Sequence, residues 1–162
     1  MKILLKIVGG LVAFLVVGLL VLSATGLEPT ANRPGLWIKG TPDTTPVADW
    51  SYTDQYVTVM IQTRPWYGLP HSVMIWCIAQ GDQLYVATSG AATRSWPRDV
   101  ARDPHVRLKI GERVYDQTLA LVTDPAERAA VLESKRKKYP GQRVPTTSQV
   151  YLFRVQPGSP AA

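Results

Sequence analysis

The chain contains an apolar segment that a very short turn connects to a second strand-like segment. Val73–Ala79 reads VMIWCIA and is continuously apolar, as expected of a strand buried on both faces. Gln80–Gln83 contains a Gly-Asp pair and turns the chain tightly into Leu84–Thr88. Parallel neighbours need a long crossover, whereas a turn of this length joins antiparallel strands. We therefore expect a β-hairpin, with Trp76 and Cys77 on opposite faces of its first strand.

Similar patterns predict further strands on either side of this hairpin. A β-branched stretch covers Tyr56–Gln62, and a second hairpin joins Val106–Ile110 to Arg113–Val122. A last strand is expected at Val150–Val155. Because the connections between most of these segments are short, antiparallel pairing is favoured. The sequence therefore predicts a mainly β domain of the α+β class, a small antiparallel barrel of six strands.

Two helices are expected beside these strands. The first begins near Ser95, which can serve as its N-cap, and Pro97 suits its first turn. The second has Asp124 as N-cap, followed by a proline, and Glu127 completes a capping box. Its last turn, residues 135–138, is basic and suits the negative end of the helix dipole. We expect these basic side chains to be solvated; binding of anionic lipid is the alternative.

An uncharged apolar run precedes the strand-rich part. It extends from Ile7 to Leu22 and continues through small residues to Leu27, which reaches the roughly 20 residues of a membrane-spanning helix. A cleaved signal peptide is the alternative. Lys2 and Lys6 lie on its N-terminal side, so the positive-inside rule places the N-terminus in the cytoplasm. We expect a single-pass anchor in the cytoplasmic membrane, with the following domain outside, in periplasmic or extracellular space.

The sequence divides into four parts. Residues 1–27 form the transmembrane anchor or signal-like segment. Residues 28–48 are rich in proline and glycine, which predicts an extended linker. The barrel domain is expected at residues 49–157 and is followed by a short tail, residues 158–162.

The charge balance and the motifs exclude several classes of function. The chain carries 18 Lys and Arg against 12 Asp and Glu, a formal charge of +6, which suits phosphorylated small molecules or anionic lipid. No nucleic-acid-binding motif is visible, so nucleic acid is not an expected partner. Cys77 is the one cysteine, and His71 and His105 lack the spacing of metal ligands, so neither an internal disulfide nor a metal site is expected. The sequence also has no nucleophile elbow or P-loop, and no catalytic residue can be named from it.

The segment Ser89–Leu108 is the best candidate for a ligand site. A helix N-terminus attracts anions through its unpaired N–H groups and its dipole. Here Arg94 and Arg98 add positive charge beside Ser95. The same residues also fit an ordinary capped helix with solvated arginines. A small molecule that carries a phosphate is the ligand that this pattern favours.

The order of these elements resembles the flavin-binding split β-barrel superfamily, which includes pyridoxamine-phosphate oxidase-like proteins and deazaflavin-dependent nitroreductases. The resemblance extends from about Val57 to Val155. It rests on the Val57–Val73 hairpin, Leu84–Gly90 (LYVATSG), Trp96 with Asp103-Pro104-x-Val106, and the passage from Arg113 to Arg128. It implies a six-stranded split barrel, FMN or a deazaflavin as cofactor, and a homodimer with the cofactor at the subunit interface.

The resemblance also implies roles for individual residues. In such proteins the turn after the third strand and the start of the short helix hold the edge and the phosphate of the cofactor. The residues at these positions are Thr88, Ser89 and Gly90 at the ring edge, and Arg94, Ser95, Trp96 and Arg98 at the phosphate. Arg64 would reach the phosphates from the turn between the first two strands. Trp66, Tyr67 and His71 would meet the ring or the substrate.

The turn between the first two strands departs from the deazaflavin-dependent pattern. That turn is usually polar, basic and glycine-containing, whereas here residues 63–71 read TRPWYGLPH. Its aromatic residues could form a stacking platform for a flat ring, a hydrophobic plug, or a lip that touches the membrane. Two functions remain open: a membrane-anchored, extracytoplasmic flavin- or deazaflavin-binding oxidoreductase, or a non-catalytic split-barrel module for binding or assembly that has lost its cofactor.

Overall fold

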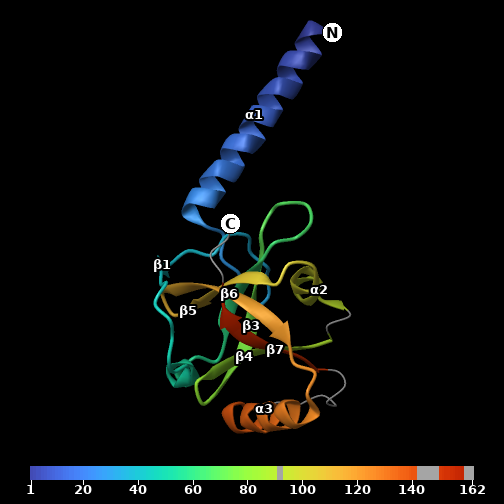
Figure 1. Ribbon diagram of the computed structural model, residues 1–162. Coiled ribbons are helices and arrows are strands. Elements are labelled where there is room, and N and C mark those ends of the chain that lie inside the picture. The colour runs from blue at the N-terminus through green and yellow to red at the C-terminus, as the bar shows by residue number, and fades with distance from the viewer. Residues whose placement is uncertain (91–92, 142–149, 159–162) are drawn as a thin grey trace.

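A closed antiparallel barrel forms the body of the protein (Figure 1). The computed structural model describes residues 1–90, 93–141 and 150–158. The barrel strands are β2 (Val59–Thr63), β3 (His71–Gln80), β4 (Gln83–Ser89), β5 (His105–Ile110), β6 (Arg113–Leu121) and β7 (Val150–Pro157). They follow the order β2-β3-β4-β7-β6-β5, and β5 pairs again with β2. The six-stranded α+β barrel expected from the sequence is confirmed.

Both short turns produce the hairpins expected from the sequence. Gly81 has φ +61° in the β3–β4 turn, and Gly111 has φ +59° in the β5–β6 turn. Backbone in this left-handed region favours glycine, because glycine has no Cβ to clash there. The register sets Cys77 opposite Val86. The first strand is shorter than expected and begins at Val59 rather than Tyr56, because Ser51–Gln55 forms the 3₁₀ helix η1 and the chain turns after it.

The hydrophobic residues form two clusters, on the two sides of the β3–β4 hairpin. The interior of the barrel contains Cys77, which is fully buried, together with Trp96 and Phe153. A second cluster lies between the outer face of the sheet and the second long helix, and Trp76 packs against it. Trp76 and Cys77 therefore lie on opposite faces of β3, as the alternation of side chains along a strand requires.

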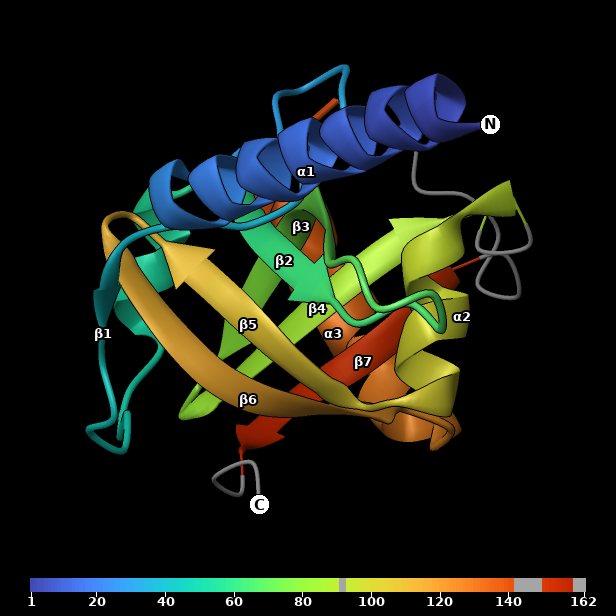
Figure 2. The ribbon, with the colours of Figure 1, turned by 90° about the horizontal axis from the view of Figure 1, so that it is seen from above.

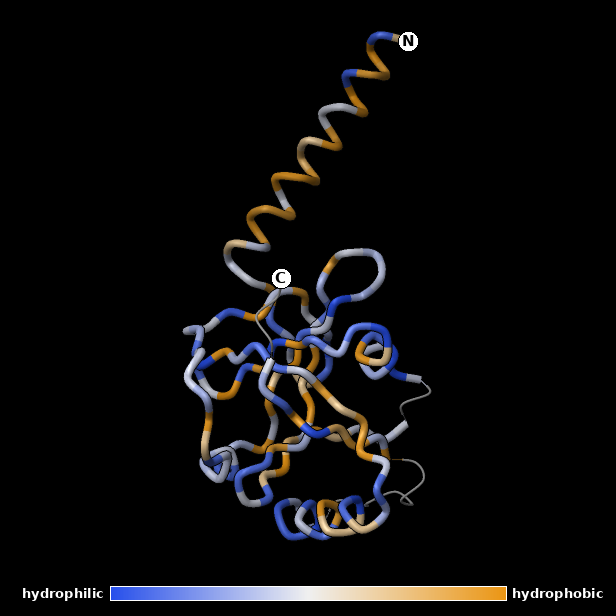
Figure 3. The backbone as a smooth tube through the Cα atoms, viewed as in Figure 1, coloured by the Kyte–Doolittle hydropathy of each residue, from blue (hydrophilic) through white to orange (hydrophobic). Residues whose placement is uncertain are grey.

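Three α-helices surround the barrel: α1 (Lys2–Thr25), α2 (Ser95–Arg102) and α3 (Pro125–Lys138). Figure 1 shows α1 leaving one end of the domain while α3 covers the opposite end. With 24 residues, α1 is about 36 Å long and has no buried residue, and Figure 3 shows it as largely hydrophobic. It is long and apolar enough to cross a membrane, a property that it shares with signal sequences.

Helix α3 begins as expected but ends differently. The Asp124 carboxylate accepts a hydrogen bond from the backbone N–H of Glu127 at 2.7 Å. The Glu127 carboxylate does not complete the capping box, because it accepts hydrogen bonds from Arg154 and Tyr85. The expectation of a solvated basic end was wrong for Lys135, which is 1% exposed and lies 4.1 Å from the centre of the Trp76 ring. It was also wrong for Lys138, whose side chain is 11% exposed.

The proline-rich segment 28–48 is extended and lies against the barrel. Its residues Thr41–Pro42 form β1, which pairs in parallel with the start of β6. Gly35 and Ser72 exchange two backbone hydrogen bonds, of 2.8 and 2.9 Å, and Ile38 is fully buried. Figure 2, seen from above, shows this segment running beneath α1 and down the side of the barrel next to β6.

Candidate functional site

A cavity of about 290 Å³ lies where β3 and β4 meet the start of α2. We call it the α2 cavity. It is lined by Ala31, Thr58, Met74, Ile75, Trp76, Ala87, Thr88, Ser89, Arg94 and Trp96. Four of these residues, Thr88, Ser89, Arg94 and Trp96, are ones that the sequence assigned to cofactor binding. The structure thus brings the end of β4 and the start of α2 together around one space.

The polar end of the α2 cavity is held by local hydrogen bonds. Gly90 has φ +68°, which turns the chain sharply after β4. The Thr93 hydroxyl closes this turn by donating to the Gly90 carbonyl at 2.9 Å. Arg94 donates from Nε to the Ser89 carbonyl oxygen at 3.3 Å, which folds its side chain back over the end of β4. The guanidinium is therefore positioned by the turn beside the cavity.

The start of α2 differs in detail from the sequence-based expectation. Arg94, not Ser95, is the N-cap, and it makes no side-chain capping bond, so the predicted Ser95 cap was wrong. The Ser95 hydroxyl lies 3.4 Å from Nδ1 of His71 at the start of β3. Because α2 begins at Ser95 itself, this hydroxyl belongs to the first turn of the helix and is not at the cap position. It also links His71 to α2, next to the α2 cavity.

His71 is half-buried, and its surroundings affect its charge. Burial lowers the pKa of His71, although the nearby Asp99 carboxylate opposes this effect. Asp99 is itself buried in α2 and accepts a hydrogen bond from the Thr63 hydroxyl at 3.2 Å. A lowered pKa keeps the imidazole neutral at pH 7, so it can donate one hydrogen bond and accept another.

The apolar walls of the α2 cavity come from residues that the sequence reasoning did not assign to a site. Met74 and Trp76 lie on the outward face of β3, and Thr58 precedes β2. Trp96 packs on Phe153 inside the barrel, with ring centres 5.4 Å apart. Strand alternation around Cys77 could have identified Met74 and Trp76 as outward-facing. The continuously apolar run, however, gave no sign that these two side chains are only partly buried.

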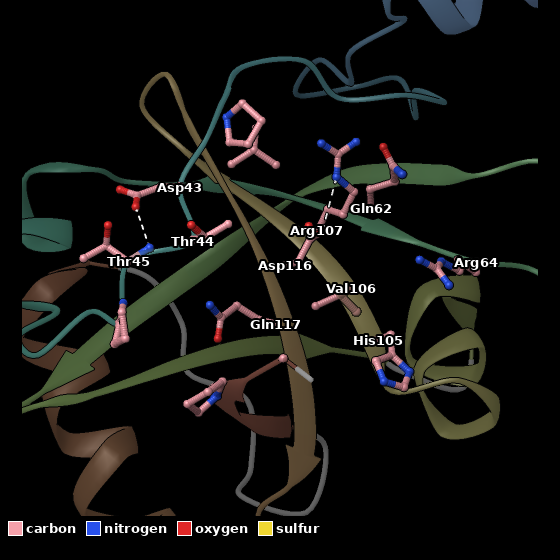
Figure 4. Close-up of a pocket in the computed structure, with 15 residues that line it drawn as sticks. Asp43, Thr44, Thr45, Gln62, Arg64, His105, Val106, Arg107, Asp116 and Gln117 are labelled. Atoms are coloured by element: carbon pink, nitrogen blue, oxygen red, sulfur yellow. Dashed lines mark hydrogen bonds and ion pairs between the residues drawn. The ribbon is translucent and has the colours of Figure 1, made fainter. Parts of the chain in front are cut away.

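A second and larger cavity of about 440 Å³ lies over β5 and β6 (Figure 4). We call it the β5–β6 cavity. Residues 42–46 form one side of it, and in Figure 4 Arg64 and His105 lie at the other end. Between them, Arg107 pairs with the exposed carboxylate of Asp116 at 3.5 Å. Arg64 therefore lines a different cavity from Arg94, and the structure does not bring these two predicted phosphate ligands together.

The remaining predicted residues lie outside both cavities. Trp66 and Tyr67 lie in the loop between β2 and β3 and are 81% and 55% exposed. Arg98 is on the exposed face of α2. Among the residues that the structure describes, no group of three His, Cys, Asp or Glu side chains could hold a metal ion.

A comparison with known protein families shows which family the chain belongs to. The model of a family of uncharacterized proteins conserved in bacteria, DUF2255, matches residues 51–152, which span the barrel from η1 to β7. The chain belongs to the DUF2255 family. No curated protein matches this DUF2255 member.

Solved structures place this DUF2255 member among split β-barrel proteins. The putative pyridoxamine 5'-phosphate oxidase of Listeria innocua is 16% identical, with a TM-score of 0.51, over 66% of this chain and 88% of that one. The heme storage protein HutZ of Vibrio cholerae is 17% identical, with a TM-score of 0.53, over 67% and 87%. An F420-H2 dependent reductase is 18% identical, with a TM-score of 0.50, over 62% and 95%. At these identities the likeness establishes only the fold that this chain shares with these proteins.

Proposed function

We propose that the protein is a membrane-anchored, extracytoplasmic oxidoreductase that binds a flavin or a deazaflavin in the α2 cavity. One observation carries this proposal. Residues from the end of β4 and the start of α2, Thr88, Ser89, Arg94 and Trp96, line a single cavity. The split-barrel fold supports it, because a putative pyridoxamine 5'-phosphate oxidase and an F420-H2 dependent reductase have the same fold.

The polar end of the cavity fits a phosphate. The first N–H groups of α2 have no partner within the helix, and the positive end of the helix dipole lies there. Arg94 adds a permanent positive charge, and among the described residues its side chain bonds the Ser89 carbonyl alone, so its other guanidinium N–H groups could bind an anion. Arg98, one turn further along α2, adds longer-range attraction.

The apolar walls fit part of a flat ring. Met74 and Trp76 provide apolar surface, and the Lys135 ammonium beneath Trp76 keeps that indole in place through a cation–π contact. The cavity volume of about 290 Å³ is at the small end of the range for ligand pockets, so a cofactor would extend out of it over the barrel surface. In a homodimer, a second subunit would cover this exposed part.

A bound flavin or deazaflavin would supply the hydride chemistry, while the protein supplies binding, orientation and electrostatics. Thr88 and Ser89 would position the ring edge through hydrogen bonds. Neutral His71, held by Ser95, could accept or donate a proton near the ring edge or the substrate. Helix α1 would anchor the barrel in the membrane, with Lys2 and Lys6 on the cytoplasmic side.

A non-catalytic binding or assembly module is the second candidate, and a specific observation favours it. Trp66 and Tyr67 point into solvent and Arg64 lines the β5–β6 cavity, so the loop between β2 and β3 contributes none of these side chains to the α2 cavity. Arg94 is then the one cationic side chain among the described residues that line the α2 cavity. A split-barrel protein that no longer binds a cofactor would be expected to lack such cofactor-binding side chains.

Spectroscopy of the full chain, purified in mild detergent, tests the proposal. We expect either a flavin or deazaflavin absorption band in the purified protein, or fluorescence quenching when FMN, riboflavin and a phosphorylated deazaflavin are titrated in turn. Tighter binding of the phosphorylated compounds than of riboflavin supports the proposed site. Absence of binding by all three would reject the oxidoreductase and support the cofactor-free module.

A further inference from the structure

We propose that the loop between β2 and β3, residues 64–70, inserts its aromatic tip into the headgroup region of the membrane that α1 enters. We call this loop the aromatic loop. The inference rests on the proposed anchoring by α1. It concerns a surface that the proposed cofactor site does not use.

The backbone of the aromatic loop presents two rings at its tip. The Gly68 N–H donates to the Pro65 carbonyl at 3.1 Å, which closes a four-residue turn. Trp66 and Tyr67 occupy the two central positions of this turn. Their rings meet edge to face, with centres 5.8 Å apart. Both rings are exposed at the tip of the loop.

The composition of the tip suits a membrane interface. Trp66, Tyr67 and Leu69 are 81%, 55% and 36% exposed, and no charged residue lies between Arg64 and His71. A group of exposed apolar side chains marks an interaction surface. Tryptophan and tyrosine favour the boundary between lipid and water, because their rings are apolar and carry a polar group.

The aromatic loop lies at the end of the domain from which α1 leaves. Just after α1, Leu27 exchanges backbone hydrogen bonds with the segment Leu36–Trp37, at 2.7 and 3.0 Å. Gly35, in the same segment, pairs with Ser72, the second residue of β3. These contacts connect the end of α1 to the strand that follows the aromatic loop. In Figure 1 the tip of the loop, in green, rises to about the level of the last turn of α1.

Lipid is the occupant that these observations favour. Neither Trp66 nor Tyr67 lines the α2 cavity or the β5–β6 cavity, so a small ligand in either cavity would not touch them. A membrane that contains α1 would lie at the height of the loop tip, on the same side of the domain. A second copy of the chain is the competing occupant, and the experiment below distinguishes it.

Spin labels on the full chain in vesicles of phosphatidylcholine and phosphatidylglycerol test the proposal. One label replaces Leu69 (Leu69→Cys) and the control label replaces Asp82 (Asp82→Cys) in the exposed β3–β4 turn. This turn lies at the far end of the ten-residue strand β3, about 30 Å from the aromatic loop. The native Cys77 is fully buried, and the unsubstituted chain checks that it stays unlabelled.

Power saturation measures whether each label meets oxygen, which is enriched in lipid, or a water-soluble nickel complex. We expect the label at position 69 to favour oxygen and the label at 82 to favour nickel. Adding Trp66→Ser and Tyr67→Ser should bring position 69 to the accessibility of position 82. Tyr151→Ser serves as the matched control and should leave position 69 unchanged, because Tyr151 is exposed on β7, whose neighbouring residues pack against α3 at the opposite end.

A third label, Leu15→Cys in α1, separates the two proposals. A lipid-accessible label at 15 with a water-accessible label at 69 would overturn the loop proposal and leave the anchoring intact. Water access at both positions would overturn the anchoring and the loop proposal together. Dipolar broadening at 69, with exclusion of both oxygen and nickel, would show a contact between two copies and would also overturn the proposal.

Discussion

The ammonium group of Lys138 lies 3.5 Å from the sulfur of Cys77, although the two residues are 61 positions apart. Lys138 is the last residue of α3 and lies largely buried beneath the barrel. It also donates to the Thr53 carbonyl at 2.9 Å and pairs with Asp54 at 3.4 Å. Burial raises the pKa of the Cys77 thiol despite the nearby ammonium, so this thiol stays protonated at neutral pH. Through these contacts Lys138 connects the end of α3 with η1 and β3.

From these contacts of Lys138 we predict that Lys138→Met destabilises the protein. The substitution removes a hydrogen bond from a charged donor and a half-buried ion pair, which we expect to lower the free energy of unfolding by about 1–3 kcal/mol. The neighbouring exposed Lys137 offers a matched control, and Lys137→Met should change stability by less than about 0.5 kcal/mol. Denaturant unfolding of the full chain in detergent measures both. Equal effects of the two substitutions would contradict the structural role of Lys138.

The Glu127–Arg154 pair predicts a dependence of stability on acid. Hydrogen bonds from Arg154 and Tyr85 hold the pKa of Glu127 below its usual value. A carboxyl with a lowered pKa contributes stability above its unfolded pKa, about 4.3, and loses it as the pH falls through the folded value. Between pH 6 and pH 3, Tm should therefore fall less for Glu127→Gln than for the parent.

Glu133→Gln is the matched control for this acid dependence, since Glu133 is exposed and, in the described part of the chain, pairs with Arg136 alone. Its Tm should fall with acid as much as that of the parent. If Glu127→Gln shows the same acid-induced fall as the parent, the Glu127 pair does not contribute to acid stability.

The proposed phosphate site predicts a selective effect of Arg94. A charge-assisted hydrogen bond contributes about 1.5–3 kcal/mol. Arg94→Ala should therefore weaken FMN binding roughly tenfold to a hundredfold and leave riboflavin binding nearly unchanged. Arg98→Ala should have a smaller effect in the same direction, because Arg98 does not line the cavity.

Arg107→Ala controls for the loss of an arginine elsewhere, because Arg107 lines the β5–β6 cavity. His105→Ala, just beyond α2, is a second control. Both should bind FMN as the parent does, in fluorescence titrations of the full chain. An Arg94→Ala variant that still distinguishes FMN from riboflavin as well as the parent would remove Arg94 from the phosphate site.

Lys2 and Lys6, in the first two turns of α1, predict the orientation of the chain. Protease added to intact spheroplasts should digest the barrel and leave a short protected fragment that contains α1. The fragment is measured with an N-terminal tag, which stays protected in this orientation. Full protection of the barrel, or a mature chain that begins near Leu27, would overturn the predicted anchor.

Local signals in the sequence predicted most of the barrel. The β3–β4 and β5–β6 hairpins follow from their turn residues, because a tight turn fixes the pairing of the strands beside it. Asp124 likewise predicts the start of α3 by a bond within one turn. Features that depend on distant partners were not predicted. The burial of Lys135 depends on Trp76, and the docking of segment 28–48 depends on Ser72.

In the candidate site too, residues close together in the sequence could be grouped correctly, whereas the position of a residue from another hairpin could not be predicted. Thr88, Ser89, Arg94 and Trp96 are close in sequence, and the structure gathers them around one cavity. Arg64 comes from another hairpin, and its position depends on how that hairpin bends relative to β5. A sequence pattern carries no measure of that bend, which is why the sequence could not show that Arg64 and Arg94 line different cavities.

The pairing of Gly35 with Ser72 attaches the segment that follows α1 to strand β3 of the barrel. A Cβ atom at position 35 would collide with the Leu27 carbonyl oxygen. The backbone at Gly35 therefore packs tightly against the backbone at Leu27, just after α1. With α1 in a bilayer, the docking of this segment leaves little free chain between α1 and the barrel, so the barrel would stay close to the membrane surface. Its encounters are then those of a body that diffuses in two dimensions, and molecules that reach the α2 cavity must come to the membrane surface to do so.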